Sequence, residues 1–371
     1  MTVTVRSFAK INLGLRIGAA RGDGFHELLT VYQTIGLHDV IRVSVRRGKG
    51  IEIQCADPRV PRDESNTCFR MVEKTMLALR AKGRVVIEIE KRLPVQGGLG
   101  GASSNAVATL LGLERALGKS LSVAEKLRIA AEVGSDLPLF LVGGTVLGVG
   151  RGEQVYPLPD FPVMACVAVT PEVGVSTPKA YADWDRSCGD RQGLKPCSSD
   201  DVDAALKGRS STVASKSKVA AKSTVSSKST VALKSPSDKL TVSSGSDRMN
   251  ELGRGLSAWL SERYSSAPSG FLARGGRAEN PLLWLVRAGI ENDFERVVFP
   301  EYPELSDGKS ALLRAGAKYA SLSGSGSTLY GLFATRESAA RATARLRKQG
   351  WAAILTATLT RRAYWRRILA G

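Results

Sequence analysis

The chain has 371 residues, of which 43% are hydrophobic and 24% are charged, so it is long enough to bury a core in two domains. This composition excludes a wholly disordered or collagen-like chain. An excess of 53 Lys and Arg over 35 Asp and Glu gives a formal net charge of +18 and raises the hypothesis of a polyanionic partner. Most of this charge lies in residues 205–246 and 336–371, so the rest of the chain is nearly balanced.

The five cysteines are odd in number, widely spread and never in a CxxC pair. This pattern argues against a disulfide framework and a zinc site, and it favours a reducing cytoplasm. The N-terminal residues lack the basic and apolar regions of a signal peptide, and the weakly polar run 137–150 is too short to span a bilayer. We therefore expect a soluble, cytoplasmic protein.

Alternating apolar residues at 11–17, 40–45 and 85–89 predict half-buried strands. The period then changes, because the apolar residues between 106 and 117 have the spacing of an amphipathic helix. Ser122 and Glu125 form a capping box for a second helix that Gly134 can end. Strands and helices without a regular βαβ rhythm predict an α+β fold.

Residues 185–258 contain no aromatic residue, and the hexapeptides SSTVAS, KSKVAA, KSTVSS and KSTVAL follow one another over residues 210–233. A hexapeptide β-helix needs about three such units for each coil, so four units cannot bury a core. We therefore predict a disordered, low-complexity insert at about residues 187–250. Periodic structure resumes near Asn280, with strands at 320–322, 328–333 and 352–359 and a helix at 337–349.

Residues 91–106, KRLPVQGGLGGASSNA, lead from a predicted strand through a glycine-rich loop into a helix. Glycines let a backbone approach a ligand closely, and a helix N-terminus offers N–H groups and a positive dipole end, so this loop suits a phosphate. Ser103 and Ser104 could add hydroxyls to a phosphate or a metal. The loop is not a Walker A motif because it lacks the required lysine, and a glycine-rich turn with a capping serine is the simpler alternative.

Two shorter segments add to this pattern. LSGSGS at 322–327 lies between two predicted strands, and GSDLP at 134–138 ends one helix and begins another. Asp136 is therefore either a helix N-cap ahead of Pro138 or a general base.

In this order, FAKINL at 8–13, PVQGGLGGASSNA at 94–106 and SLSGSGST at 321–328 resemble the three motifs of the GHMP kinases. Residues 21–28, RGDGFHEL, and the text of residues 291–304 resemble the subgroup whose acceptor is 4-diphosphocytidyl-2-C-methyl-D-erythritol. The resemblance covers roughly residues 2–184 and 275–366, which is everything except the insert.

The resemblance implies a two-domain GHMP kinase fold, with ATP and substrate in the cleft between the domains. The N-terminal ATP-binding domain, residues 1–158, would contain a left-handed βαβ unit. The C-terminal substrate domain, residues 159–371, would be ferredoxin-like and interrupted by the insert. A monomer or a homodimer would be compatible with this organisation.

The implied reaction transfers the γ-phosphoryl group of ATP to the 2-hydroxyl of the methylerythritol moiety, in the non-mevalonate isoprenoid pathway. Asp136 would accept the hydroxyl proton, and Lys10 would stabilise the oxygen and keep Asp136 ionised. Mg²⁺ would bind through the ATP phosphates and water, and no protein ligand for a metal is assigned. ATP binding falls to Asn66, Lys91, Pro94, Val95, Gln96, Gly97, Gly98, Leu99, Gly100, Gly101, Ala102, Ser103 and Ser104.

Two of these ATP positions have simpler explanations, and a third departs from the family pattern. Asn66 and Lys91 match family positions near the adenine, but a helix cap and a lysine that extends its amine to solvent are simpler explanations. Gln96 departs from the family pattern, in which a small residue is usual at this point of the loop.

The resemblance assigns the substrate to Asn12, Phe25, His26, Thr177 and Tyr181. An aromatic pair would stack on the cytosine and His26 would hydrogen-bond the edge of the base. Phe25 stands where Tyr is common, so stacking is kept and a hydroxyl contact is lost.

Two alternatives remain. The acceptor could instead be a homoserine- or mevalonate-type alcohol, or the basic insert and tail could bind nucleic acid. The second alternative predicts aromatic residues among the basic ones; the insert has none, although Tyr364 and Trp365 lie among tail arginines. We therefore expect a small-molecule partner with a cytidine diphosphate group, and neither a membrane nor a nucleic acid.

Overall fold

A computed structural model describes residues 1–192 and 291–369. The predicted insert, apart from its first six residues, and the return of periodicity near Asn280 lie outside the described residues. The described residues up to Trp184 and from Glu291 onward belong to one compact unit, and the domain boundary at 158/159 stays a prediction. Within the described ranges, no helix is both long and apolar enough to cross a membrane.

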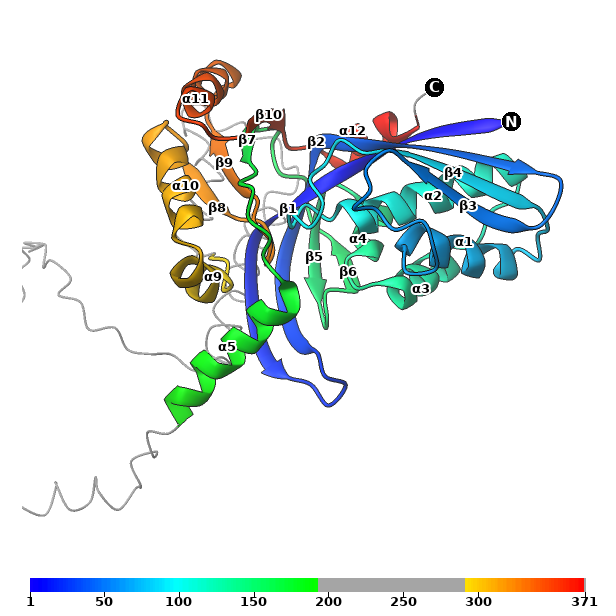
Figure 1. Cartoon of the computed structure of the whole chain (residues 1–371), viewed down its shortest axis with the longest axis horizontal. Coiled ribbons are helices and arrows are strands. Elements are labelled where there is room, and N and C mark those ends of the chain that lie inside the picture. The colour runs from blue at the N-terminus through cyan, green and yellow to red at the C-terminus, as the bar shows by residue number, and fades with distance from the viewer. Residues whose placement is uncertain (193–290, 370–371) are drawn as a thin grey trace, which may run out of the picture. The chain divides into compact units, whose positions relative to one another are not determined.

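Two long antiparallel strands, β1 (Thr2–Ala20) and β2 (His26–Arg46), pair along almost their whole length (Figure 1). β2 also pairs with β4 and β5, so it lies at the centre of a six-stranded sheet in the order β3-β4-β2-β5-β6, with β1 on β2. The other strands of this sheet are β3 (Gly50–Cys55), β4 (Arg84–Glu90), β5 (Thr145–Val149) and β6 (Gln154–Pro157).

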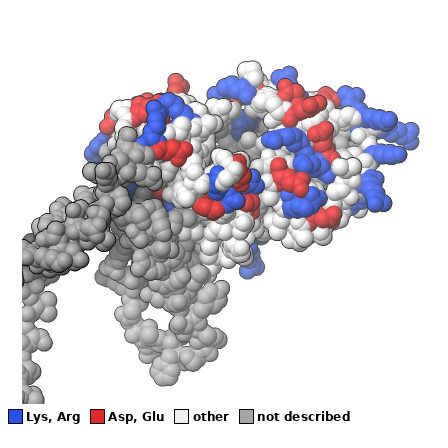
Figure 2. All heavy atoms as spheres, turned by 90° about the horizontal axis from the view of Figure 1, so that it is seen from below, with Lys and Arg blue, Asp and Glu red and all other residues white. Residues whose placement is uncertain are grey.

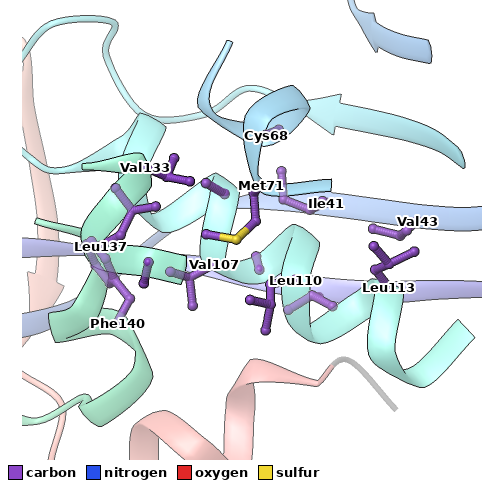
Figure 3. Packing of buried hydrophobic residues seen from close by; sticks show 14 of the residues in the cluster. Ile41, Val43, Cys68, Met71, Val107, Leu110, Leu113, Val133, Leu137 and Phe140 are labelled. Carbon is purple, nitrogen blue, oxygen red and sulfur yellow. The ribbon is translucent and has the colours of Figure 1, made fainter. Parts of the chain in front are cut away.

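Helices form a layer on one face of this sheet: α1, α2 and α4 contact its strands, and α3 packs on α1 and α4. Met71 lies among Val107, Leu110 and Ile41, which come from another helix and from β2 (Figure 3). β3 and β4 are parallel and joined through α1, which gives the expected βαβ unit. The helices of this layer are α1 (Thr67–Ala78), α2 (Gly101–Leu117), α3 (Val123–Val133) and α4 (Leu137–Val142).

A second, four-stranded antiparallel sheet has the order β10-β7-β9-β8. Helices α10 and α11 pack on it. Apart from α5 and α9, which lie between β7 and α10 in the chain, the order β7-α10-β8-β9-α11-β10 is the ferredoxin-like arrangement, so the expected two-domain α+β fold is confirmed. The bounds are β7 (Ala165–Val169), α5 (Thr177–Gln192), α9 (Glu295–Glu301), α10 (Pro303–Arg314), β8 (Tyr319–Leu322), β9 (Leu329–Phe333), α11 (Arg336–Lys348), β10 (Ala353–Ala357) and α12 (Arg361–Ile368).

The local sequence signals were accurate in several elements. α2 spans the predicted amphipathic segment, and the Ser122–Glu125 capping box begins α3, which ends at Gly134. The predicted helix at 337–349 is α11. The sequence did not predict that β1 and β2 are three to four times longer than an average strand. This length carries the two strands from one sheet to the other.

Charged side chains of both signs are interspersed on the face of the molecule shown in Figure 2. Elsewhere in the described residues, surface ion pairs include Lys74 with Glu132 at 2.7 Å and Arg84 with Glu52 at 2.7 Å. The described body is therefore electrically mixed on this face, as the sequence suggested for the chain outside its insert and tail.

Two glycine-rich loops, residues 97–101 and 323–327, contact each other through their backbones. Thr328 N donates to Gly97 O at 3.1 Å, and Ser323 Oγ donates to Gly98 O at 3.0 Å. A Cβ atom on Gly98 would lie 2.1 Å from Ser323 O, and one on Gly326 would lie 2.4 Å from Gly98 N. Only glycine therefore allows this contact between the two parts of the molecule.

We expect Gly98→Ala to destabilise the protein by about 3 kcal/mol or more, because it adds a backbone clash to the cost of a left-handed φ of 76°. Gly118→Ala is the matched control, since Gly118 has a φ of 63° and open space around it. The control should cost only about 1–2 kcal/mol. Urea unfolding measures both variants, and equal losses would contradict the role of the loop contact.

Candidate active site

Lys10 lies where the pairing of β1 with β2 becomes irregular. The register shifts between Phe8 and Lys10 and again between Asn12 and Gly14. Such bulges bend a strand and re-aim its side chains. Lys10 N donates to Leu99 O at 3.0 Å, so this point of β1 holds the first glycine loop.

The Lys10 ammonium is almost fully buried and faces two acceptors. Its Nζ donates to Asn12 Oδ1 at 2.7 Å and lies 3.4 Å from Asp136 Oδ2. Asn12 Nδ2 donates to Thr30 Oγ1, which in turn donates to Gly14 O, both at 2.8 Å. This chain fixes the Asn12 amide with its oxygen toward Lys10, so the position of the ammonium is determined by β1 and β2 together.

Asp136 occupies the N-cap position of α4, but its side chain makes no capping hydrogen bond. Its Oδ1 accepts a hydrogen bond from Tyr32 OH at 3.0 Å, and its Oδ2 faces Lys10. About a third of the side chain, 35%, is exposed. Helix capping therefore does not explain this carboxylate, which is held by β1 and β2 at the wall of a cavity.

The first glycine loop lines a cavity of about 370 Å³ together with Asn66 and Lys91. Gly100 is the N-cap of α2 and provides no side-chain cap, so the first N–H groups of the helix are left for a ligand. Gln96 has a φ of 60°, an uncommon conformation for a residue with a side chain. The loop thus has the form expected of a phosphate-binding loop.

Asp39 organises the entrance to this loop, and sequence reasoning missed it. It is fully buried and accepts four hydrogen bonds at 2.6–3.0 Å: from Lys91 Nζ, Arg92 N, Leu93 N and Asn105 Nδ2. The only sequence signal is an acidic residue at the edge of an apolar strand. The Lys91 ammonium is bound to this carboxylate and does not extend to solvent.

Two predicted ATP residues use their side chains elsewhere. Asn66 caps α1, with Oδ1 accepting from Cys68 N at 2.9 Å and Nδ2 donating to Pro61 O at 2.6 Å. The hydroxyl of Ser104 is buried and shares a hydrogen bond with that of Ser7, whereas Ser103 lines the cavity.

A second cavity of about 400 Å³ shares Gly98, Gly100 and Ser103 with the first. The two cavities therefore meet at the glycine loop, with Lys10 and Asp136 on the wall of the second. The wall also includes Asn12, Phe25, Tyr32, Arg151, Thr177, Tyr181, Phe294, Gly324 and Ser325.

Aromatic rings gather at the far end of the second cavity. The rings of His26 and Tyr181 stack with centroids 5.0 Å apart, and Tyr181 meets Phe294 edge-on at 4.9 Å. Phe25 is 48% exposed, and the Arg151 guanidinium lies 4.8 Å from its centroid. The structure thus places His26 directly against Tyr181, which leaves no room for a base between those two rings.

The second glycine loop is held in place by the segment before α9. Asn292 Nδ2 donates to Leu322 O at 2.9 Å and to Gly324 O at 2.7 Å. The buried carboxylate of Asp293 accepts from Arg16 and from Ile17 N, both at 2.9 Å. β1 and this loop are therefore fixed to each other, and sequence reasoning assigned no role to either residue.

Thr177 links helix α5 to the same loop, because its Oγ1 lies 2.7 Å from Ser325 Oγ in a hydrogen bond. Four of the five predicted substrate residues line the second cavity: Asn12, Phe25, Thr177 and Tyr181. The fifth, His26, stacks on the Tyr181 ring.

Residues 66–144 match the family model of the GHMP kinases N terminal domain, and residues 282–351 match that of the GHMP kinases C terminal domain. A 4-diphosphocytidyl-2-C-methyl-D-erythritol kinase of Solibacter usitatus is 33% identical over 99% of this chain and 92% of its own length. The chain belongs to the GHMP kinase family. It is therefore an ATP-dependent small-molecule kinase.

Other proteins similar to this chain are also GHMP kinases. The enzyme of the same name from Acaryochloris marina is 32% identical over 91% of this chain and 88% of its own length. Among solved structures, a 4-(cytidine 5'-diphospho)-2C-methyl-D-erythritol kinase has a TM-score of 0.60 at 23% identity, over 96% of this chain and 98% of that chain. A homoserine kinase from Cytophaga hutchinsonii has a TM-score of 0.62 at 18% identity, over 97% and 95%. These two structures show the common fold and do not separate one acceptor from another.

We expect Asp39→Asn in this kinase to cost about 3–5 kcal/mol of stability, because an amide N–H₂ would face buried donors and leave Lys91 uncompensated. The KM for ATP should rise several-fold while the KM for the acceptor changes little. Glu132→Gln, an exposed carboxylate on α3 that pairs with Lys74 and Arg128, is the control and should alter neither constant. Thermal unfolding and initial rates at varied ATP check both effects, and an unchanged KM for ATP would contradict them.

Proposed function

We propose that this kinase transfers the γ-phosphoryl group of ATP to the 2-hydroxyl of 4-diphosphocytidyl-2-C-methyl-D-erythritol, in the non-mevalonate isoprenoid pathway. The proposal is supported by the names of its full-length relatives at 32–33% identity. The decisive structural observation is Asp136, whose carboxylate caps no helix and instead lies between Lys10 and Tyr32 beside the shared glycine loop.

Phosphoryl transfer requires mainly positioning and neutralisation of charge. The N–H groups of the loop and of the start of α2 bind the ATP phosphates, and Ser103 can add a hydroxyl where the two cavities meet. Asp136 accepts the proton of the acceptor hydroxyl as its oxygen bonds to the γ-phosphorus. The bond from the γ-phosphorus to the β,γ-bridging oxygen breaks, and ADP leaves with the electron pair.

Lys10 has two effects in this scheme. Its ammonium forms an ion pair with the Asp136 carboxylate at 3.4 Å, and it stabilises the acceptor oxygen as that oxygen loses its proton. Asn12 accepts a hydrogen bond from the ammonium and so fixes its position for both effects. Because Lys10 is nearly fully buried, its charge acts in a poorly screened environment.

Mg²⁺ would enter with the ATP phosphates and water. Among residues 1–192 and 291–369, no group of three or more His, Cys, Asp or Glu side chains is arranged to hold a metal ion, so no protein ligand is assigned. We assign the adenine end of ATP to the part of the first cavity lined by Asn66 and Lys91, and the phosphate end to residues 94–104.

The cytidine end of the acceptor would occupy the aromatic part of the second cavity. Phe25 offers an exposed face, Tyr181 offers a ring fixed by His26 and Phe294, and Thr177 offers a hydroxyl. We further propose an ATP-binding domain at residues 1–158, a substrate domain at 159–371, a cytoplasmic location, and a monomer or homodimer.

Asp136→Asn should lower kcat by at least about a thousandfold, because the amide cannot accept the hydroxyl proton. The variant should still bind the acceptor. Asp307→Asn, an exposed position on α10, is the control and should keep wild-type turnover. ADP release measured with the cytidyl acceptor gives the rates, and near-normal turnover of Asp136→Asn would remove this residue from the mechanism.

The identity of the acceptor is tested by presenting 4-diphosphocytidyl-2-C-methyl-D-erythritol, homoserine and mevalonate separately with ATP. We expect turnover with the first alone. Phe25→Ala should raise the KM for this acceptor about tenfold, since a base loses one stacking face, and should leave the KM for ATP unchanged. Phe25→Tyr, which keeps the ring, is the control. Preference for homoserine or mevalonate would contradict the proposal.

A further inference from the structure

Tyr32 is a fully buried phenol in the middle of β2, and its hydroxyl reaches the active-site wall. Its OH donates to Asp136 Oδ1 at 3.0 Å, and its ring lies 5.6 Å from Lys10 Nζ. We propose that Tyr32 is a positioning residue for the kinase reaction, which holds the Asp136 carboxylate so that Oδ2 accepts the acceptor proton. This inference rests on the proposed function, in which Asp136 is the base.

The hairpin formed by β5 and β6 holds the Tyr32 ring in one position. A Cβ atom on Gly148 would lie 2.5 Å from Tyr32 Cε2, and one on Gly152 would lie 2.6 Å from Tyr32 OH. Gly152 has a φ of 98°, which glycine adopts without strain. The hydroxyl group therefore occupies space that only glycine at position 152 leaves open, and the ring has little freedom to turn away from Asp136.

The hydroxyl group acts as a donor and not as a second base. Burial, followed by the charge of Asp136, raises the pKa of the Tyr32 phenol well above its usual value, so it stays protonated. Because Oδ1 accepts the hydrogen bond from Tyr32, Oδ2 is the carboxylate oxygen left to accept the acceptor proton, and it lies next to Lys10. Since Asp136 makes no bond to the backbone of α4, these two contacts determine its orientation.

Tyr32→Phe removes the donor and keeps the ring. We expect kcat to fall about 10- to 100-fold, the effect of losing a hydrogen bond to a charged, oriented group. The KM for ATP should stay within about twofold, because the glycine-loop cavity is untouched. Tyr364→Phe is the matched control: it removes a buried hydroxyl that donates to Phe140 O at 2.7 Å, outside both cavities, and should keep wild-type kcat.

A double-mutant cycle separates this proposal from the proposed function. If Tyr32 acts through Asp136, adding Tyr32→Phe to Asp136→Asn should lower the residual rate no further. Full additivity of the two losses, or wild-type turnover of Tyr32→Phe alone, would overturn the positioning role. Wild-type turnover of Asp136→Asn alone would instead overturn the proposed function. Thermal unfolding of Tyr32→Phe and Tyr364→Phe shows whether both variants lose similar stability.

Discussion

The contact between the two glycine-rich loops is the constraint on which the site depends. At Gly98 and Gly326 the backbones come so close that any side chain would overlap a main-chain atom. This closeness brings the first glycine loop next to the second, which follows β8, and residues of both loops line the second cavity. Hydrogen bonds from Thr328 N and Ser323 Oγ join the two loops.

Buried charges on β1 and β2 hold the side chains of the proposed site in place. Asp39 holds Lys91 and the backbone at the start of the first loop, and Lys10 is shared between Asn12 and Asp136. Each of these ions is compensated by hydrogen bonds from several elements, as a buried ion requires. The same compensation makes the site sensitive to single substitutions, since removing one partner leaves another uncompensated.

The net charge of +18 is a poor guide to the partner of this protein. Most of the net positive charge lies in a low-complexity stretch and in the C-terminal tail, whereas the described body mixes both signs on the face shown in Figure 2. Tail residues also have structural partners: Arg361 donates to Thr145 O at 2.9 Å, and Trp365 Nε1 donates to Val142 O at 3.0 Å. These contacts account for part of the tail without invoking a polyanion.

The sequence by itself determined the family, the α+β class, α2, α3 and α11, and the two glycine loops, because caps, periodicity and glycine spacing are local properties. Only the tertiary structure showed which groups the Asp136 side chain contacts. The sequence left a helix cap and a general base open for this residue, and the structure shows no capping hydrogen bond and places Tyr32 and Lys10 beside the carboxylate. Asp39, Asn292 and Tyr32 were invisible for the same reason: their partners are dozens of residues away or more, and no local pattern records a long-range hydrogen bond.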